Sequence, residues 1–269
     1  MTDWLEICRA AVDDVRRVLE QLPTREEREP IVGAGVGGDD TTAIDAAAEA
    51  AIVARLEAAH EGGVEFTLVS EELGERVFGD GASTWVVVDP IDGSVNSKRG
   101  VRFFSLSVAV AEGPRMDDVL WGYVYDFGTG EEWTAERGRG ARLNGTELGD
   151  VRPKESIELL SFEATVTELV AKHVAAFDGL AERIRIMGSL ALSLCHFAAG
   201  RIDAVCSLKP ARAVDIAAAQ LLIRECGLVI DLPEAPPFDA APLDTVGRSR
   251  VVAAAHAETC ERLAAALGV

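Results

Sequence analysis

Residues 85–96 read Trp-Val-Val-Val-Asp-Pro-Ile-Asp-Gly-Ser-Val-Asn, and the rest of the chain is best understood from this stretch. Its first four residues are apolar and rich in β-branched side chains, which predicts a strand buried on both faces. Asp89 and Asp92 should then lie at the carboxyl end of that strand, where α/β sheets place their ligand crevices. Pro90 lacks an N–H and Gly93 permits close approach of the backbone, so both suit the point where the chain leaves the sheet.

The residues that follow the second aspartate are suited to binding an anion. If a helical turn begins at Gly93 and Ser94, its first amides point at whatever the acids hold. Carboxylates repel a neighbouring phosphate unless cations lie between them, and Mg²⁺ is commonly held by a few carboxylates together with phosphate oxygens. Glu71 and Glu72 end another strand-like run, so a neighbouring strand would bring further acids to the same edge.

Composition predicts a globular protein without a membrane span. The 269 residues, 48% of them hydrophobic, suffice for one large domain or two fused halves. The longest apolar candidate, around 187–200, is interrupted by serine and histidine and falls short of the roughly 18 residues that a membrane span needs. The first residues lack a basic stretch followed by an apolar run, so we expect no secretory signal and a cytoplasmic location.

The charge of the chain is strongly negative. A net charge of -19 arises from 45 acidic and 26 basic residues, and only four of the bases are lysine. Such a surface excludes binding to a nucleic-acid backbone, which requires a basic face. Many acids with few lysines are typical of proteins that work in concentrated salt, so a halophilic cytoplasm is our hypothesis. A GC-rich genome that replaces lysine by arginine is the alternative explanation.

Several other motifs carry no chemistry. The five cysteines are widely spaced in apolar contexts, so we expect packing residues, and the four histidines lack metal-ligand spacing. No Gly-x-Ser-x-Gly elbow supports a serine triad. Residues 33–38 match G-x-G-x-x-G by letter, but the preceding segment is charged and ends in proline rather than forming a buried strand. We therefore interpret 33–38 as a mobile loop near an active site.

The pattern of elements changes near Pro153. Residues 1–153 predict an α+β half with a largely antiparallel sheet, and residues 154–269 alternate strand and helix, which predicts an α/β half. In the first half, helices are expected at 3–22 and 43–60, and strands at 64–70, 84–89, 103–112, 120–127 and 131–136. In the second half, strands are expected at 159–163, 183–187, 203–207, 228–231 and 250–254, and helices at 167–178, 189–199, 214–226 and 257–267.

Taken together, the motifs resemble the inositol monophosphatase family of metal-dependent phosphomonoesterases. The most specific match is the block 89–94, which is accompanied by Asn96. The resemblance implies a layered sandwich of alternating α-β-α-β-α layers, and it is strongest to archaeal members, which often hydrolyse both inositol phosphates and fructose 1,6-bisphosphate. Further matching positions are Thr42, Asp45, Glu71, Glu72, Gly140, Ala141, Asn144, Gly145, Gly188, Ser189, Arg212 and Asp215.

The resemblance also implies the metal ligands and the reaction. One Mg²⁺ would be held by Glu71, Asp89 and the carbonyl of Ile91, and a second by Asp89, Asp92 and Asp215, with Mn²⁺ able to substitute. A third, weaker cation would lie near Glu71 and Asp45. A water activated by the metal and oriented by Asp45 and the Ser94 hydroxyl would attack phosphorus directly, while the amides of Gly93 and Ser94 bind the phosphate oxygens.

The residues that would contact the substrate are Ser189, Lys209 and Arg212, and the last two suit a second phosphate or a sugar-phosphate hydroxyl. Leu208 stands where animal inositol phosphatases carry a glutamate, which weakens a strict preference for inositol. Loop closure would use Asp39 and Asp40 through the third cation. The resemblance implies a homodimer acting on a small-molecule phosphate ester. A nucleotide 3′-phosphatase or NADP phosphatase is the alternative enzyme, and a metal- and anion-binding regulator without turnover is the non-enzyme alternative.

The halophile hypothesis predicts that salt stabilises the fold. The melting temperature should rise from low salt to molar KCl, because screening reduces the repulsion among the 45 acids. Thermal melts followed by circular dichroism at several KCl concentrations measure this. Equal or greater stability at low salt would contradict the hypothesis and favour the genomic explanation.

Overall fold

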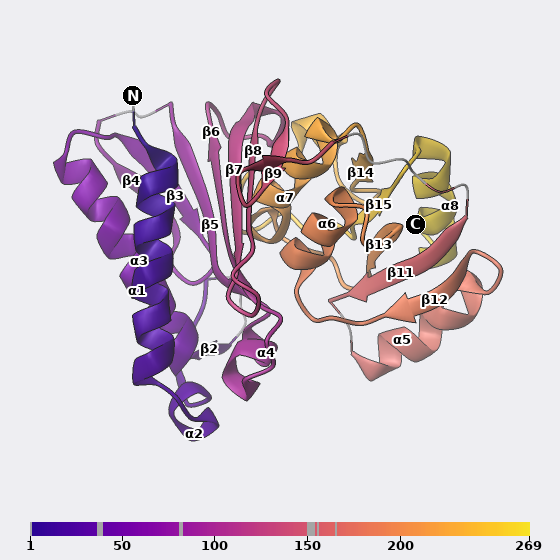
Figure 1. The fold of residues 1–269 in the computed structure, drawn as a ribbon, viewed down its shortest axis with the longest axis horizontal. Coiled ribbons are helices and arrows are strands. Elements are labelled where there is room, and N and C mark those ends of the chain that lie inside the picture. Colours follow the sequence, from indigo (N-terminus) through magenta and orange to yellow (C-terminus); the bar gives the residue numbers. More distant parts are fainter. Residues whose placement is uncertain (1, 37–39, 81–82, 150–153, 155, 165) are drawn as a thin grey trace.

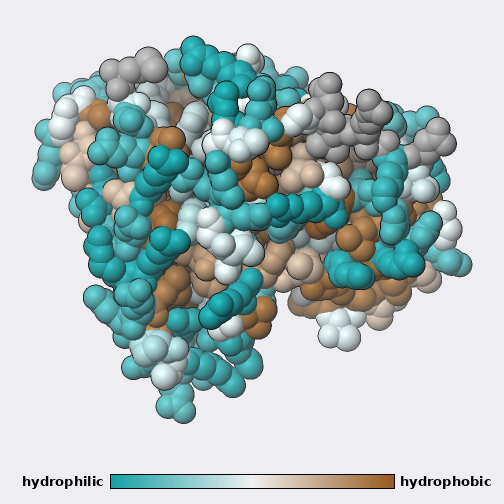
Figure 2. Space-filling model, in the orientation of Figure 1, coloured by the Kyte–Doolittle hydropathy of each residue, from teal (hydrophilic) through white to brown (hydrophobic). Residues whose placement is uncertain are grey.

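The computed structural model describes residues 2–36, 40–80, 83–149, 154, 156–164 and 166–269. Its elements form five layers, in which helices and sheets alternate across the molecule (Figure 1). The layered α/β sandwich expected from the sequence is therefore confirmed. The expected boundary at Pro153 lies outside the described residues, so the division into two halves stays a prediction. Figure 2 shows hydrophilic residues over most of the visible face, in keeping with the acidic composition.

The first layer consists of two long helices that cover one face of the larger sheet. α1 (Trp4–Gln21) and α3 (Ala43–Glu61) agree with the predicted helices to within one residue at each end. Asp3 caps α1 by accepting from the Glu6 amide, and Thr42 begins α3 with Asp45 as its reciprocal partner. Their apolar sides pack together on the sheet, and a short α2 (Arg25–Arg28) follows α1.

The second layer is an eight-stranded sheet in the order β10-β9-β8-β7-β6-β5-β3-β4. Only β3 and β5 pair in parallel, so the largely antiparallel sheet is confirmed. β4, β9 and β10 were not predicted as strands, nor was the separate β1–β2 pair, because these segments are short or lack a long apolar run. The bounds are β1 (Ile31–Ala34), β2 (Asp40–Thr42), β3 (Phe66–Ser70), β4 (Gly74–Phe78), β5 (Trp85–Asp92), β6 (Ser105–Ala111), β7 (Val119–Asp126), β8 (Glu132–Glu136), β9 (Ala141–Leu143) and β10 (Thr146–Glu147).

The remaining three layers come from the second half of the chain. Two buried helices lie between the sheets, and a five-stranded sheet in the order β12-β11-β13-β15-β14 follows, covered by outer helices. None of the helices in the described ranges is both long and apolar enough to cross a membrane. The bounds are β11 (Ile157–Glu163), α5 (Thr167–His173), β12 (Ala181–Arg185), α6 (Leu190–Ala198), β13 (Ala204–Ser207), α7 (Ala213–Glu225), β14 (Val229–Asp231), β15 (Val252–Ala254) and α8 (Ala257–Leu267), with 3₁₀ turns at Met116–Asp118, Val174–Phe177 and Phe238–Ala240 and the short α4 (Ser94–Arg99) after β5.

Apolar side chains of β5 divide between the two faces of the sheet. Val86 and Val88 pack toward α1 and α3, whereas Val87 packs toward α6 and α7. This alternation explains why the strand is apolar at every position. The cluster around α6 and α7 also contains residues of the second sheet, so both halves of the chain share one core. All five cysteines are free thiols and four of them are buried, as expected for packing residues.

The parallel pairing of β3 and β5 positions the site. Ser70 lies opposite Val88, so the residues that follow, Glu71 and Asp89, lie next to each other where β3 ends. β5 extends to Asp92, three residues beyond the predicted end, because its pairing with β6 is irregular between Asp89 and Asp92. The irregularity accommodates Pro90, which cannot donate to a regular ladder.

The close approach of α7 to β7 at Gly122 yields a stability prediction. A Cβ at this position would lie 2.6 Å from the carbonyl oxygen of Ala218 and 3.2 Å from its Cα. Gly122→Ala should therefore lower the free energy of unfolding by about 1–3 kcal/mol, because either α7 or β7 must shift to make room for the added Cβ. Urea denaturation measures this. Gly149→Ala is the matched control, since a Cβ there meets nothing within 4 Å. Its free energy of unfolding should stay within about 0.5 kcal/mol of the wild type. Equal losses in both variants would contradict the packing argument.

Candidate active site

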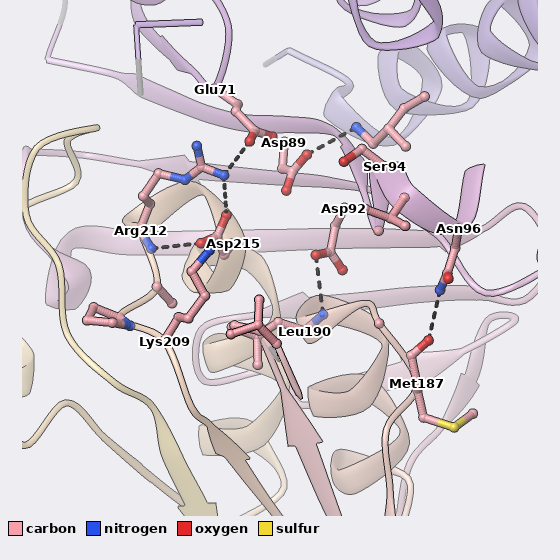
Figure 3. A pocket seen from close by; sticks show the side chains of 18 of the residues that line it. Glu71, Asp89, Asp92, Ser94, Asn96, Met187, Leu190, Lys209, Arg212 and Asp215 are labelled. Atoms are coloured by element: carbon pink, nitrogen blue, oxygen red, sulfur yellow. Dashed lines mark hydrogen bonds and ion pairs between the residues drawn. The ribbon is translucent and has the colours of Figure 1, made fainter. Parts of the chain in front are cut away.

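A cavity of about 680 Å³ opens where the carboxyl ends of β3 and β5 meet the first turns of α4 and α7 (Figure 3). Its size is in the range of small-molecule sites. It brings together most of the side chains expected to act in the site. The predicted residues that line it are Glu71, Asp89, Ile91, Asp92, Gly93, Ser94, Lys209, Arg212 and Asp215.

Two neighbouring strands supply the first acids. Asp89 is 2% exposed, and its Oδ1 accepts a hydrogen bond of 3.1 Å from the amide of Ile91. Burial, together with the negative charges of Glu71 and Asp92, raises the pKa of Asp89 well above its usual range. Burial likewise raises the pKa of Glu71, to about 7, against the opposing effect of Arg212. The repulsion between these acids calls for a positive partner.

Asp92 is held by the amino terminus of α6. Its Oδ2 accepts from the Ser189 hydroxyl and, at 2.9 Å, from the Ala191 amide, and its Oδ1 accepts from the Leu190 amide at 3.2 Å. Ser189 is the N-cap of α6 and lies behind Asp92 rather than on the cavity wall. A carboxylate is favourable at this end of a helix, because the first amides lack partners within the helix. Burial still raises the pKa of Asp92, to about 7, although the Ser189 hydrogen bond opposes the shift.

Asp215 lies in the first turn of α7, where Arg212 is the N-cap. Its Oδ2 accepts a hydrogen bond of 2.7 Å from the Arg212 backbone amide, so capping fixes the carboxylate at the cavity edge. The guanidinium of Arg212 turns toward the acids. Its Nη2 donates to Glu71 Oε1 and lies 3.4 Å from Asp215 Oδ1 (Figure 3). This ion pair joins side chains that are 141 positions apart in the sequence.

Asp45, near Glu72, is not among the residues that line the cavity. Its Oδ2 accepts from the Thr42 hydroxyl at 2.5 Å and from the Thr42 amide at 3.3 Å. Its Oδ1 is buried and has no hydrogen-bond partner among the described residues. Burial raises the pKa of Asp45, against the effect of the Thr42 hydrogen bonds. A buried carboxylate oxygen without a partner is costly, so an additional cation or water is expected there.

The chain turns into α4 directly after β5. Gly93 adopts the left-handed region with φ of 93°, and Ser94 is the first residue of α4. The predicted helical turn at this position is therefore confirmed. Asn96 fastens the turn from both sides, because its Nδ2 donates to the carbonyls of Phe103 and Met187 at 2.8 Å each. The first amides of α4 lie on the cavity wall with the acids.

Another part of the cavity wall is formed by loops of the second half. Lys209 and Arg248 line it, and Arg248 was missed because nothing in its sequence context signals a site. Glu163 was also missed, although it stands at a predicted strand end. It accepts hydrogen bonds from the amides of Met187 at 3.3 Å and Gly188 at 2.9 Å, so it orders the loop that leads to α6.

The glycine-rich segment is partly described. Gly33 belongs to β1, and the amide of Val36 donates to the carbonyl of Glu72 at 3.3 Å, which places the segment beside the acids. Residues 37–39, including Asp39, lie outside the described residues, and Asp40 begins β2. Loop closure through Asp39 and Asp40 therefore stays a prediction.

The carboxylates of the cavity are oxygen ligands of the kind that a hard divalent cation prefers. Four carboxylates with little or no exposure face one cavity, and burial raises the pKa of three of them, as expected for acids that need a cation. In the described part of the chain, no three acidic, histidine or cysteine side chains are arranged to hold a metal ion as they stand. Arg212 lies between two of the acids and contacts both.

Comparison with known proteins agrees with these features. The chain matches the model of the inositol monophosphatase family over residues 3–268. A fructose-1,6-bisphosphatase/inositol-1-monophosphatase from Methanothermobacter thermautotrophicus is 33% identical, covering 99% of this chain and 97% of that protein. A crystal structure of an inositol monophosphatase-fructose 1,6-bisphosphatase is similar with a TM-score of 0.84 at 26% identity, covering 98% of this chain and 100% of that one.

Two further relatives carry other names. A Nus factor SuhB from Pasteurella multocida is 35% identical, covering 72% of each chain. A bifunctional NADP phosphatase/NAD kinase from Methanococcus maripaludis is 29% identical, covering 85% of this chain but 43% of that protein. The family match extends over nearly the whole sequence, and the acids of the matching motifs converge on one cavity. The resemblance inferred from the motifs is confirmed: the chain belongs to the inositol monophosphatase family.

Proposed function

We propose that this chain is a magnesium-dependent phosphomonoesterase that hydrolyses a small sugar or polyol phosphate, such as fructose 1,6-bisphosphate or inositol 1-phosphate. The observation that supports it most is the convergence of four carboxylates with the first turn of α4 in one cavity. Acids alone would repel a phosphate ester, whereas acids with cations would bind it. The phosphatase names among the relatives support the same class of reaction.

The metal ligands of this proposal are those that the resemblance implies. Glu71, Asp89 and the carbonyl of Ile91 would hold one Mg²⁺ or Mn²⁺, and Asp92 and Asp215 would share Asp89 with a second. Glu71 and Asp45 would hold a third, weaker ion, for which the unpartnered Oδ1 of Asp45 is suited. Bound cations of this kind offset the charge of the phosphate and lower the pKa of water.

The side chains and amides of the protein would bind the phosphate and orient the attacking water. The amides of Gly93 and Ser94 bind phosphate oxygens, and Asp45 with the Ser94 hydroxyl orients the attacking water and accepts its proton. The water oxygen would bond to phosphorus as the ester P–O bond breaks. The leaving alkoxide would take up a proton from a neighbouring water, and Asp45 would return its proton to solvent. No covalent phosphoenzyme forms, since the water attacks directly.

The part of the cavity wall that carries Lys209 and Arg248 would select the substrate. Lys209 and Arg248 give this wall a positive charge that suits a second phosphate. Ser189, which the resemblance places at the substrate, would act indirectly through its hydrogen bond to Asp92. Leu208, at the position of the animal glutamate, is 2% exposed and offers the cavity no polar group.

One observation favours the alternative substrate, a nucleotide 3′-phosphate or NADP. Val95, Val166 and Ile186 line the cavity, although Val95 is 61% exposed and the other two are about half exposed. Such an apolar rim could contact a nucleobase, and one relative is named an NADP phosphatase. A regulator without turnover is the remaining alternative, and a release assay separates all three. The cytoplasmic location and the homodimer stay predictions.

Phosphate release tests the function directly. With Mg²⁺ in molar KCl, the chain should release phosphate from fructose 1,6-bisphosphate or inositol 1-phosphate faster than from NADP or a nucleoside 3′,5′-bisphosphate.

Asp92→Asn should lower kcat on the order of 10²-fold, because it removes a charged cation ligand with little change of shape. Asp126→Asn is the control, since Asp126 is 1% exposed but lies at the β7–β8 hairpin. No release from any substrate would favour the regulator, and full turnover in Asp92→Asn would contradict the assigned role.

The turn at Gly93 supplies a second prediction. A Cβ there would lie 3.0 Å from the carbonyl oxygen of Gly188 and 3.1 Å from that of Phe103, so Gly93→Ala must displace α4. We expect a loss of about 1–2 kcal/mol in unfolding free energy and a fall in kcat/KM on the order of 10²-fold, because the phosphate-binding amides move.

Gly100→Ala is the matched control for Gly93→Ala. Gly100 also has a positive φ, of 72°, but a Cβ there meets nothing within 4 Å. Its stability should fall by a similar backbone cost, while its kcat/KM stays near that of the wild type. If Gly93→Ala were as active as Gly100→Ala, the placement of phosphate at the start of α4 would be wrong.

A further inference from the structure

Arg212 forms an ion pair inside the group of acids rather than in solvent. Its Nη2 contacts Glu71 Oε1 and lies 3.4 Å from Asp215 Oδ1 (Figure 3). The side chains of Arg212, Glu71 and Asp215 are 13%, 18% and 14% exposed. At such low exposure, water and salt screen the interaction far less than at an open surface.

The positive charge of Arg212 is permanent. Burial alone would lower the pKa of Arg212, but the charges of Asp215, Glu71 and Asp89 raise it above its usual value. A guanidinium group has no neutral form in proteins under ordinary conditions. Arg212 therefore offsets the repulsion among these acids at any working pH.

The oxygens that Arg212 contacts are those that a metal ion would need. Asp215 Oδ2 accepts the Arg212 backbone amide at 2.7 Å, whereas Oδ1 accepts no backbone hydrogen bond from the described residues and faces the guanidinium. The guanidinium faces this Oδ1 and Glu71 Oε1 together. One positive group excludes another from the same pair of oxygens, which agrees with the lack of a ready metal cluster in the described part of the chain.

Arg212 also borders two cavities. It lines the large cavity and a second, largely apolar cavity of about 210 Å³. Side chains of Met116, Ile216 and Leu232 form part of the second cavity. Both cavities therefore offer space next to the Arg212 side chain.

We propose that Arg212 is a built-in competitor of the divalent cations. It neutralises Glu71 and Asp215 in the metal-free chain and withdraws from both when a cation binds. This inference rests on the proposed metal-dependent function. By linkage, the ion pair weakens metal binding by the same factor by which it stabilises the metal-free site. The opposite case, in which Arg212 positions the acids for the metal, would make its removal weaken binding.

Titration of the metal-free full-length chain with Mn²⁺, followed by calorimetry, separates these two cases. Arg212→Gln should bind Mn²⁺ about tenfold more tightly than the wild type, within the usual range of coupling between two sites. In EDTA, its melting temperature should fall, because the acids lose their counter-charge. Addition of Mn²⁺ should then raise the melting temperature more than in the wild type.

Lys209→Gln is the matched control, since it removes one positive charge from the wall of the same cavity. Its effect on Mn²⁺ affinity acts only through space and should vanish in molar KCl, whereas the effect of Arg212→Gln should persist. Unchanged or weaker affinity in Arg212→Gln would overturn the proposal, as would a gain no larger than that of Lys209→Gln.

Arg212→Lys keeps the charge but loses the planar group that faces two oxygens at once, so it provides the test if Arg212→Gln does not fold. It should bind Mn²⁺ more tightly than the wild type, by a smaller factor, and no gain would overturn the proposal. If the wild type itself bound no Mn²⁺, the proposed function would fail together with this inference. If the wild type bound Mn²⁺ and the variants showed no gain, only the role of Arg212 would be wrong.

Discussion

The structure depends on the mutual repulsion of carboxylates gathered where water is scarce. Asp89 and Asp92 are 2% and 8% exposed and face Glu71 and Asp215 in one cavity. Burying such charges is costly unless each finds a partner. The fold meets this cost with backbone amides on Asp89 and Asp92 and with the guanidinium of Arg212 on the other two acids. A group of acids maintained at such a cost is typical of a functional site rather than of a stabilising one.

The two helices of the middle layer connect core packing to the site. α6 and α7 bury their side chains against both sheets, and the first turn of each reaches the cavity. The first turn of α6 binds Asp92, while the first turn of α7 carries Asp215. The acids of the first sheet are thus held in place by helices from the second half of the chain. A change in the packing of these helices, such as a side chain at Gly122, would therefore shift the acids of the site as well as lower the free energy of unfolding.

Most of the fold could be predicted because periodicity and strand-end acids are local signals. The run 85–88 predicted a buried strand, and the parallel pairing with β3 then placed Glu71 beside Asp89. The predicted strand ended too early because proline usually ends a ladder, whereas an irregular pairing accommodates Pro90 here. The contact of Arg212 with Glu71 spans 141 positions and leaves no local pattern. Glu163 was recognisable as a strand-end acid, but its acceptor role depends on a loop that only the tertiary structure brings near.

The ion pair of Arg212 also bears on the order of binding. While the guanidinium contacts Glu71 and Asp215, its charge is paired with these two acids. If a cation displaces it into the large cavity, the wall with Lys209 and Arg248 gains a third positive charge. The affinity of that wall for an anionic substrate would then increase as the metal binds, because the two events share one side chain. Metal loading would thus precede tight substrate binding, which follows from the displacement of one residue and requires no movement of a domain.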